Sequence, residues 1–299
     1  MESTIQSFEA QIKKAGILSE ALPYLQRFRG HTFVIKLGGS AMENEDLVGA
    51  VMRDIVLMEV IGINPVVVHG GGKFISAGMA EAGLEPHFIG GMRVTDEESI
   101  KIVDRTLNET INSLLVSQMS KYGGHPLGLK GQEVFVGEKT NGMVDGEPVD
   151  LGYVGKVTNC NLERLHEAMA DEKTPVLSPL ARNQDGGDLP LNINADLAAS
   201  ALAKHMKATK LVYLSDVLGV MRDFKDPNTL ISSIDEEGAE NLIEEGIIQG
   251  GMIPKVRSSL DALHAGVGKV HMIDGRIPHS LLLEVFTDIG IGTEIVLAT

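Results

Sequence analysis

Short apolar runs that alternate with helix-like stretches are the feature that most constrains this chain. The runs are HTFVIKLGG, PVVVHGGG, VFVGEK, PVLSPL, KLVYLSD and GKVHMID. Runs so rich in valine, leucine and isoleucine are typical of strands buried on both faces, and the stretches between them have apolar residues at helical spacing. The alternation therefore predicts an α/β fold: a three-layer αβα sandwich around a central, mainly parallel sheet.

Two segments depart from this alternation. Residues 4–28 have helical periodicity, and Gly16 and Pro23 predict a break or kink within an N-terminal helical extension that we assign to residues 1–30. Residues 133–157 are β-rich on both sides of Asp145-Gly146, a dipeptide that favours a hairpin turn.

Charge and cysteine content exclude several classes of protein. The 299 residues include 26 Lys+Arg and 41 Asp+Glu, a net charge of −15, which argues against a nucleic-acid partner or an anionic membrane surface. The single cysteine, Cys160, has no partner for an intrachain disulfide, and we interpret it as an ordinary residue. The sequence has neither a signal-peptide pattern nor an apolar run long enough for a membrane span, so we expect a cytoplasmic protein.

Two glycine clusters follow strand-like runs, at residues 36–40 (KLGGS) and 69–73 (HGGGK). Ligands of open α/β sheets bind beyond the carboxyl ends of the strands. Glycine lets backbone N–H groups approach anionic oxygens, and the helix that follows adds a favourable dipole. The pair predicts an anion site, although each cluster is also compatible with a tight turn. Neither cluster matches a P-loop or the dinucleotide fingerprint, which leaves a hydride-transfer enzyme as a weaker alternative.

Two later segments contribute charged residues at predicted helix starts. In LNINAD, Asn192 and Asn194 precede a helix that opens near Ala195, with Asp196 in its first turn. An Asn can cap a helix there and an Asp can complement its dipole. In GGMIPKV, Lys255 lies in a first helical turn, where a cation opposes the dipole. That position is more easily explained if the lysine faces an anion.

Five segments, VIKLGGS, VVVHGGGK, GMRVTD, LNINAD and GGMIPKV, resemble in this order the amino acid kinase family. The resemblance extends from about residue 30 to the end and implies an amino acid kinase domain over 31–299, with an acceptor lobe over about 31–185 and a nucleotide lobe over about 186–299. GMRVTD and NINAD point to the members that use ATP to phosphorylate the side-chain carboxylate of N-acetyl-L-glutamate in arginine biosynthesis. Alternatives are a member with another acceptor and a non-catalytic, arginine-responsive binding protein.

The resemblance also assigns roles to individual residues. Lys36 and Lys255 would neutralise the transferring phosphoryl group, and Asp196 would orient both lysines. The other implied contacts are Gly38, Gly39, Ser215 and Asp216, together with the two lysines, on the nucleotide, and Gly71, Gly72, Arg93 and Asn192 on the acceptor. A carboxylate acceptor is already ionised at neutral pH, so no general base is expected. Mg²⁺ would be carried mainly by phosphate oxygens, and no protein metal ligand is assigned.

Two positions differ from the family pattern. Ser215 stands where a threonine is usual, and Lys130 follows Gly-Leu where a serine is usual. Lys130 would either add positive charge near the acceptor or point to solvent.

Both ends of the chain resemble arginine-inhibited members of the family. Those members carry an N-terminal helix that interlaces dimers into a hexamer, a trimer of dimers, and residues 271–295 resemble their C-terminal signature. The implied arginine site consists of Tyr24, Lys210, His271, Glu284 and Gly290. A PII-type signalling protein binds some family members, and this sequence does not decide whether one binds here.

Overall fold

A computed structural model describes residues 8–42, 44–144, 146–287 and 290–298, and it confirms the predicted αβα sandwich. In spatial order the central sheet consists of β12 (Ser233–Ile234), β14 (Thr293–Ile295), β13 (Lys269–Asp274), β11 (Lys210–Ser215), β1 (Thr32–Leu37), β2 (Asn64–His69), β8 (Thr174–Leu177) and β5 (Pro126–Leu129). The six strands from β13 to β5 run parallel. β14 is antiparallel to β13, and β12 runs parallel to β14.

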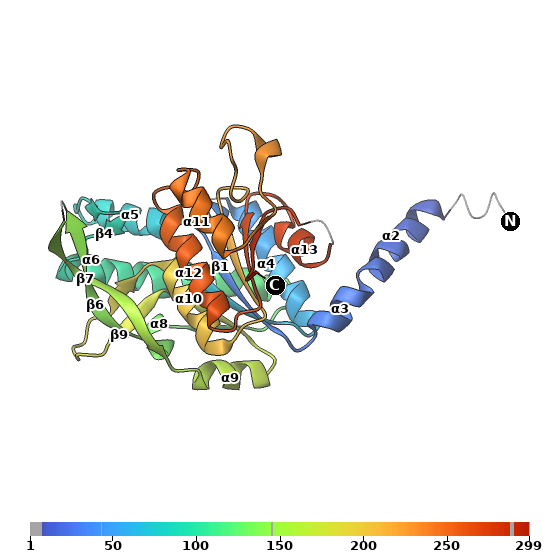
Figure 1. The fold of residues 1–299 in the computed structure, drawn as a ribbon. Helices are drawn as coiled ribbons and strands as arrows, with labels where there is room; N and C mark the ends of the chain where they lie inside the picture. Colours follow the sequence, from blue (N-terminus) through green and yellow to red (C-terminus); the bar gives the residue numbers. More distant parts are fainter. Residues whose placement is uncertain (1–7, 43, 145, 288–289, 299) are drawn as a thin grey trace.

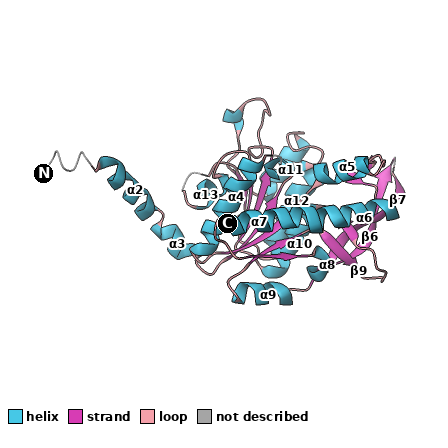
Figure 2. Ribbon diagram, turned by 180° about the vertical axis from the view of Figure 1, so that it is seen from behind, coloured by secondary structure: helices cyan, strands magenta, loops and turns pink. Residues whose placement is uncertain are grey.

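Helices cover both faces of this sheet (Figures 1 and 2). On one face lie α8 (Gly131–Val134), α9 (Glu163–Ala170), α10 (Ala195–Met206), α11 (Glu236–Glu244) and α12 (Met252–His264). On the other lie α4 (Glu45–Val60), α5 (Gly72–Glu81), α6 (Glu97–Arg105), the π-helix η2 (Thr106–Ile111), α7 (Asn112–Lys121) and α13 (Ser280–Val285). Successive residues of one strand serve opposite cores: Val34 packs with the first set, and Phe33 and Ile35 with the second. This explains why the strands have no polar face.

Side-chain caps set the starts of several helices. The side chains of Asn44, Asp96, Asn194 and Asp235 accept N–H groups from the first turns of α4, α6, α10 and α11. Two short 3-10 helices, η1 (Ser40–Met42) and η3 (Pro227–Thr229), lie in connections. The π-helical segment η2 interrupts the helical stretch that α6 and α7 form, and apolar periodicity gives no sign of it.

A long hairpin forms in the β-rich segment around residues 133–157, as predicted. β6 (Phe135–Val144) pairs antiparallel with β7 (Glu147–Cys160), and the pair closes with β9 (Leu180–Asn183) and β10 (Leu191–Ile193) into a small barrel. The predicted turn falls partly on Asp145, which lies outside the described residues. The short hairpin of β3 (Phe88–Ile89) and β4 (Met92–Arg93) contacts β6 and β7. Both hairpins lie at one end of the molecule (Figure 1).

The N-terminal extension forms an arm that projects from the sandwich (Figures 1 and 2). It consists of α2 (Glu9–Glu20) and α3 (Leu22–Phe28). The predicted break occurs at Ala21, with Pro23 in the first turn of α3, whereas Gly16 continues α2. The first seven residues of the predicted extension lie outside the described part. In the part of the chain that is described, no helix combines the length and apolar character needed to cross a bilayer.

Candidate active site

Two lysines and one aspartate meet beyond the carboxyl end of β1. Lys36 is the penultimate residue of β1, whereas Asp196 and Lys255 lie in the first turns of α10 and α12. Asn194 fixes the start of α10, because its side chain accepts the N–H groups of Asp196 and Leu197. Lys36 Nζ lies 2.7 Å from Asp196 Oδ1, and Lys255 Nζ lies 3.3 Å from Asp196 Oδ2. The structure thus brings together the three residues predicted to be catalytic.

The charges of this cluster do not cancel. Burial opposes ionisation of Asp196, but the ammonium groups of Lys36 and Lys255 outweigh it and hold the pKa of that carboxyl below its usual value. One carboxylate between two lysines leaves an excess of positive charge at the carboxyl end of β1. Lys255 Nζ also lies 5.6 Å from the centre of the Tyr213 ring, which helps to keep it beside Asp196. An excess cation at this position favours a bound anion.

A cavity of about 470 Å³ opens beside the cluster. Of the residues predicted from the sequence, it is lined by Lys36, Gly39, Gly71, Gly72, Arg93, Asn192 and Asp196. Lys255 joins the cluster through Asp196 without lining this cavity.

Arg93 supplies a second cation to the same cavity. Its Nη2 donates to the carbonyl of Gly72 at 3.0 Å and to Ser76 Oγ at 2.8 Å. Its guanidinium lies 4.7 Å from the centre of the Phe88 ring. Burial lowers the pKa of Arg93, yet a guanidinium remains charged at physiological pH. Within the described ranges no carboxylate pairs with Arg93, so an anionic ligand would supply the missing counter-charge.

Asn192 is held in the cavity by a residue that sequence reasoning missed. Its Nδ2 donates to Thr95 Oγ1 at 3.2 Å, and Thr95 Oγ1 in turn donates to the carbonyl of Arg93 at 2.8 Å. Thr95 belongs to the GMRVTD segment, so the motif contained it, but nothing in its spacing indicated the contact. Thr140 and Lys156 also line the cavity from the β6–β7 hairpin. That hairpin was predicted, but its position over the cleft was not.

Besides Lys255, three predicted nucleotide contacts lie outside the cavity lining. Ser215 is buried at the end of β11 with its Oγ 3.4 Å from the carbonyl of Ile273, and Asp216 follows it in an exposed turn. Their role on the nucleotide stays a prediction. The N–H of Gly38 already donates to the carbonyl of Leu214 at 2.9 Å, and a Cβ on Gly38 would lie 2.5 Å from that oxygen. Gly38 thus permits close approach of two backbones, and its N–H is engaged in this conformation. Its contact with the nucleotide also stays a prediction.

Lys130 points to solvent, the second of the two alternatives predicted for it. Its side chain is exposed and does not line the cavity, and its N–H donates to Glu133 Oε1 at 2.9 Å at the start of α8.

A second cavity, of about 710 Å³, collects all five residues predicted for arginine: Tyr24, Lys210, His271, Glu284 and Gly290. It lies between α3, β11, β13 and α13, so the arm contributes to its wall. Lys210 Nζ lies 2.9 Å from His271 Nε2, His271 Nδ1 lies 2.6 Å from Glu284 Oε1, and the N–H of Ile291 donates to Glu284 Oε2 at 2.8 Å. Because Lys210 donates, His271 Nε2 accepts and Nδ1 carries the proton.

The ionisation of this second cluster follows from its burial. Burial lowers the pKa of Lys210 to about 8 and also lowers the pKa of His271. Burial opposes ionisation of Glu284, but hydrogen bonds from His271 and Ile291 outweigh it and hold its pKa below the usual value. A neutral His271 thus donates to an ionised Glu284 inside a polar cavity.

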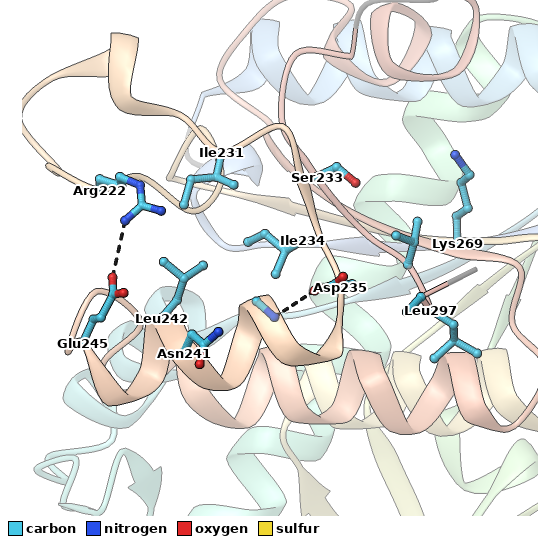
Figure 3. A pocket seen from close by; sticks show the side chains of 13 residues that line it. Arg222, Ile231, Ser233, Ile234, Asp235, Asn241, Leu242, Glu245, Lys269 and Leu297 are labelled. Atoms are coloured by element: carbon cyan, nitrogen blue, oxygen red, sulfur yellow. Dashed lines mark hydrogen bonds and ion pairs between the residues drawn. The ribbon is translucent and has the colours of Figure 1, made fainter.

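A third cavity, of about 720 Å³, contains no residue that the sequence predicted to be functional (Figure 3). It lies between β12, α11 and the C-terminal residues. Its charged side chains have partners: Arg222 faces Glu245 at 3.4 Å, Lys269 pairs with Glu294 at 2.7 Å, and Asp235 accepts the N–H of Gly238 at 2.8 Å. No uncompensated charge distinguishes it as the chemical site. Nowhere in the described residues do three His, Cys, Asp or Glu side chains gather as a metal site would require.

Lys36 at the end of β1 and Lys255 at the start of α12 share one carboxylate, and Arg93 has no carboxylate partner among the described residues. Such a site is suited to binding anionic groups. The amino acid kinase family model matches residues 31–274, and the chain belongs to that family.

Relatives that match nearly the whole chain are acetylglutamate kinases. The chain is 56% identical to an acetylglutamate kinase of Akkermansia muciniphila, over 95% of this chain and 96% of the relative. It is 47% identical to an acetylglutamate kinase of Heliobacterium modesticaldum, over 94% and 97%. This chain is therefore an enzyme of the kinase type.

Solved structures agree on the fold. The N-acetylglutamate synthase of Neisseria gonorrhoeae, in complex with coenzyme A and N-acetyl-glutamate, matches with a TM-score of 0.82 at 27% identity, over 95% of this chain. The chain spans 64% of the length of that synthase. Carbamate kinase of Giardia lamblia bound to AMP-PNP matches with a TM-score of 0.65 at 17% identity, over 90% of this chain and 99% of that one, which supports the fold alone.

Proposed function

We propose that this enzyme transfers the terminal phosphoryl group of ATP to the side-chain carboxylate of N-acetyl-L-glutamate, as a step of arginine biosynthesis. The observation that carries the proposal is the bridged pair Lys36–Asp196–Lys255 in contact with a cavity that also holds an unpaired Arg93. The relatives named acetylglutamate kinase support this acceptor. We also propose that residues of about 31–185 form the acceptor lobe and about 186–299 the nucleotide lobe, and that the enzyme works in the cytoplasm.

The proposed chemistry needs positioning and charge rather than a base. An oxygen of the acceptor carboxylate bonds to the terminal phosphorus while the bond from that phosphorus to the bridging oxygen breaks, and ADP leaves. Lys36 and Lys255 stabilise the charge on the transferring group, and Asp196 keeps both ammonium groups in place. Arg93 and Asn192 hold the polar groups of the acceptor. Mg²⁺, bound mainly to phosphate oxygens, would add further positive charge along the triphosphate.

A coupled assay of ADP release tests this function. We expect turnover with N-acetyl-L-glutamate and at least about 100-fold less with glutamate, aspartate, carbamate or UMP, because a site with built-in polar contacts rejects ligands that leave them unpaired. A higher rate with any of the other four would assign a different acceptor.

We further propose that arginine inhibits the enzyme from the second cavity and that the chain forms a hexamer through its N-terminal arm. The lining of that cavity by all five predicted residues supports the arginine site. The structure of the Neisseria synthase with L-arginine, with a TM-score of 0.79 at 27% identity, is consistent with an effector on this fold. The arm exposes Phe8, Ile12, Ile17 and Leu22, and apolar side chains so exposed favour a contact with another chain.

The arm gives a prediction about assembly. Ile12 and Ile17 are 54% and 58% exposed on α2. Replacing both by Glu should convert a hexamer into particles of one third its mass, because burying two carboxylates in a contact between arms is unfavourable. Light scattering coupled to gel filtration measures the mass, with Lys13→Gln on the same helix as the control. A wild-type chain with the mass of a dimer would contradict the hexamer.

A further inference from the structure

His69 is a buried titratable group beside the active site that the proposed chemistry does not use. It is the last residue of β2 and precedes the glycine turn 70–72, whose residues line the cavity with Lys36 and Arg93. Its side chain is completely buried. Its Nδ1 lies 3.0 Å from the carbonyl oxygen of Gly70, and its Nε2 lies 3.4 Å from Asn112 Nδ2.

These contacts select one form of the ring. A carbonyl oxygen only accepts, so Nδ1 of His69 must carry a proton and donate it to Gly70. The amide nitrogen of Asn112 only donates, and its orientation is fixed because it also donates to the carbonyl of Val176 at 2.8 Å. Nε2 of His69 must therefore accept. Burial lowers the pKa of His69 to about 4, so the neutral form with the proton on Nδ1 persists across physiological pH.

The bond to Gly70 fixes the direction of the next N–H group. The peptide between Gly70 and Gly71 is planar and trans, so its N–H points opposite to its C=O. Because His69 holds the carbonyl of Gly70 toward the interior, the N–H of Gly71 points the other way, to the side where Gly71 lines the cavity. Within the described ranges, no backbone or side-chain group accepts that N–H.

The π-helix holds both sides of this arrangement. Leu107 and Ile111, from η2, pack so closely on Gly71 that a Cβ there would collide with them. Asn112 begins α7 directly after the π-helical segment. One short stretch of the chain thus supplies the side chains that pack on the glycine turn, Leu107 and Ile111, and the donor to His69, Asn112. π-Helices occur frequently at functional sites.

We propose that His69 is a positioning residue for phosphoryl transfer: its Nδ1–H bond to Gly70 orients the peptide plane that directs the N–H of Gly71 at an oxygen of the transferring phosphoryl group or its acceptor. The inference rests on the proposed function. His69 itself touches neither substrate, and it acts through the glycine turn.

Two variants separate this role from simple packing. In His69→Asn the side-chain amide nitrogen takes the place of Nδ1 and can still donate to Gly70. In His69→Gln the amide reaches toward the place of Nε2, and the bond to Gly70 is lost. We expect kcat of His69→Asn within about threefold of wild type and kcat of His69→Gln about thirtyfold lower, with the KM for ATP little changed, since a misaligned donor weakens the transition state most.

A second measurement reads the ring directly. NMR spectra of full-length protein with ¹⁵N-labelled histidine are compared for wild type and His69→Asn, and the signal absent from the variant is assigned to His69. In the wild type that signal should show a proton on Nδ1, none on Nε2, and no titration between pH 5.5 and 9. Equal loss of kcat in the Asn and Gln variants of an active wild type, or a proton on Nε2, overturns the inference. An inactive wild type would instead overturn the proposed function, and the NMR signal distinguishes these failures.

Discussion

Replacing Lys36 by Ala should lower kcat by about 10³-fold or more, because removing a preorganised charge from a phosphoryl-transfer site costs that much. Lys36 supplies half of the positive charge that Asp196 holds at the end of β1, and it lines the cavity directly. The acceptor carboxylate is already ionised, so the reaction needs no general base. Base catalysis therefore cannot compensate for the loss of the Lys36 charge. The loss should fall mainly on kcat, since the lysine acts most strongly on the charge that develops during transfer.

The fold should survive this change. When Lys36 is removed, Asp196 keeps Lys255 at 3.3 Å, so no unpaired carboxylate is left buried. The melting temperature should therefore change by only a few degrees. Lys130→Ala is the matched control, because Lys130 is exposed and lies outside the cavity lining, and we expect its kcat to equal that of wild type. Turnover by a folded Lys36→Ala variant at the wild-type rate would contradict the proposed mechanism.

The sequence predicted the parts of this site that depend on local rules. The Asn194 cap, the first-turn positions of Asp196 and Lys255, and the glycine turns all follow from propensities over a few residues. That Asp196 bridges two lysines from different elements is a property of packing α10 and α12 against β1, which spacing alone does not encode. The resemblance to a family supplied that pairing.

Other features could not be predicted because they depend on long-range contacts. The bond from the N–H of Gly38 to Leu214 depends on the parallel pairing of β1 with β11, which the glycine cluster alone does not indicate. The π-helical turn before Asn112 has the composition of an ordinary helix, and its widening is visible only where it meets Gly71. His69 lay inside a glycine motif, yet its role depends on Asn112, 43 positions away in the chain.

The second cavity is connected to the first through paired strands and packed helices. Lys210 begins β11 and His271 lies in β13, while Lys36 lies in β1, which pairs with β11. Glu284 lies in α13, which packs against α4, the helix that follows the first glycine cluster. A ligand that shifts α13 thus has a route of packed contacts to the β1–α4 connection. The proposed inhibition by arginine would act through these contacts.

Replacing Glu284 by Gln should raise the arginine concentration for half-inhibition by about 100-fold. A carboxylate binds a guanidinium through charge-assisted hydrogen bonds. A neutral amide loses the charge-assisted part of that interaction, which we expect to weaken binding by about 100-fold. Glu284 is the natural partner because it is ionised and the His271 ring that donates to it is neutral, so the bond between them is not an ion pair. The other carboxylate of the cavity, Glu294, is already paired with Lys269 at 2.7 Å.

The measurement is ADP release against arginine concentration for wild type and for Glu284→Gln. Glu245→Gln serves as control, because Glu245 faces Arg222 across the cavity of Figure 3 and does not line the arginine cavity. The control should keep the wild-type response, because its change lies outside the arginine cavity. A wild type unaffected by millimolar arginine would remove the effector from the proposal. Equal sensitivity of Glu284→Gln and wild type would place arginine in another cavity, because no guanidinium ligand of this site should tolerate the loss of its counter-charge.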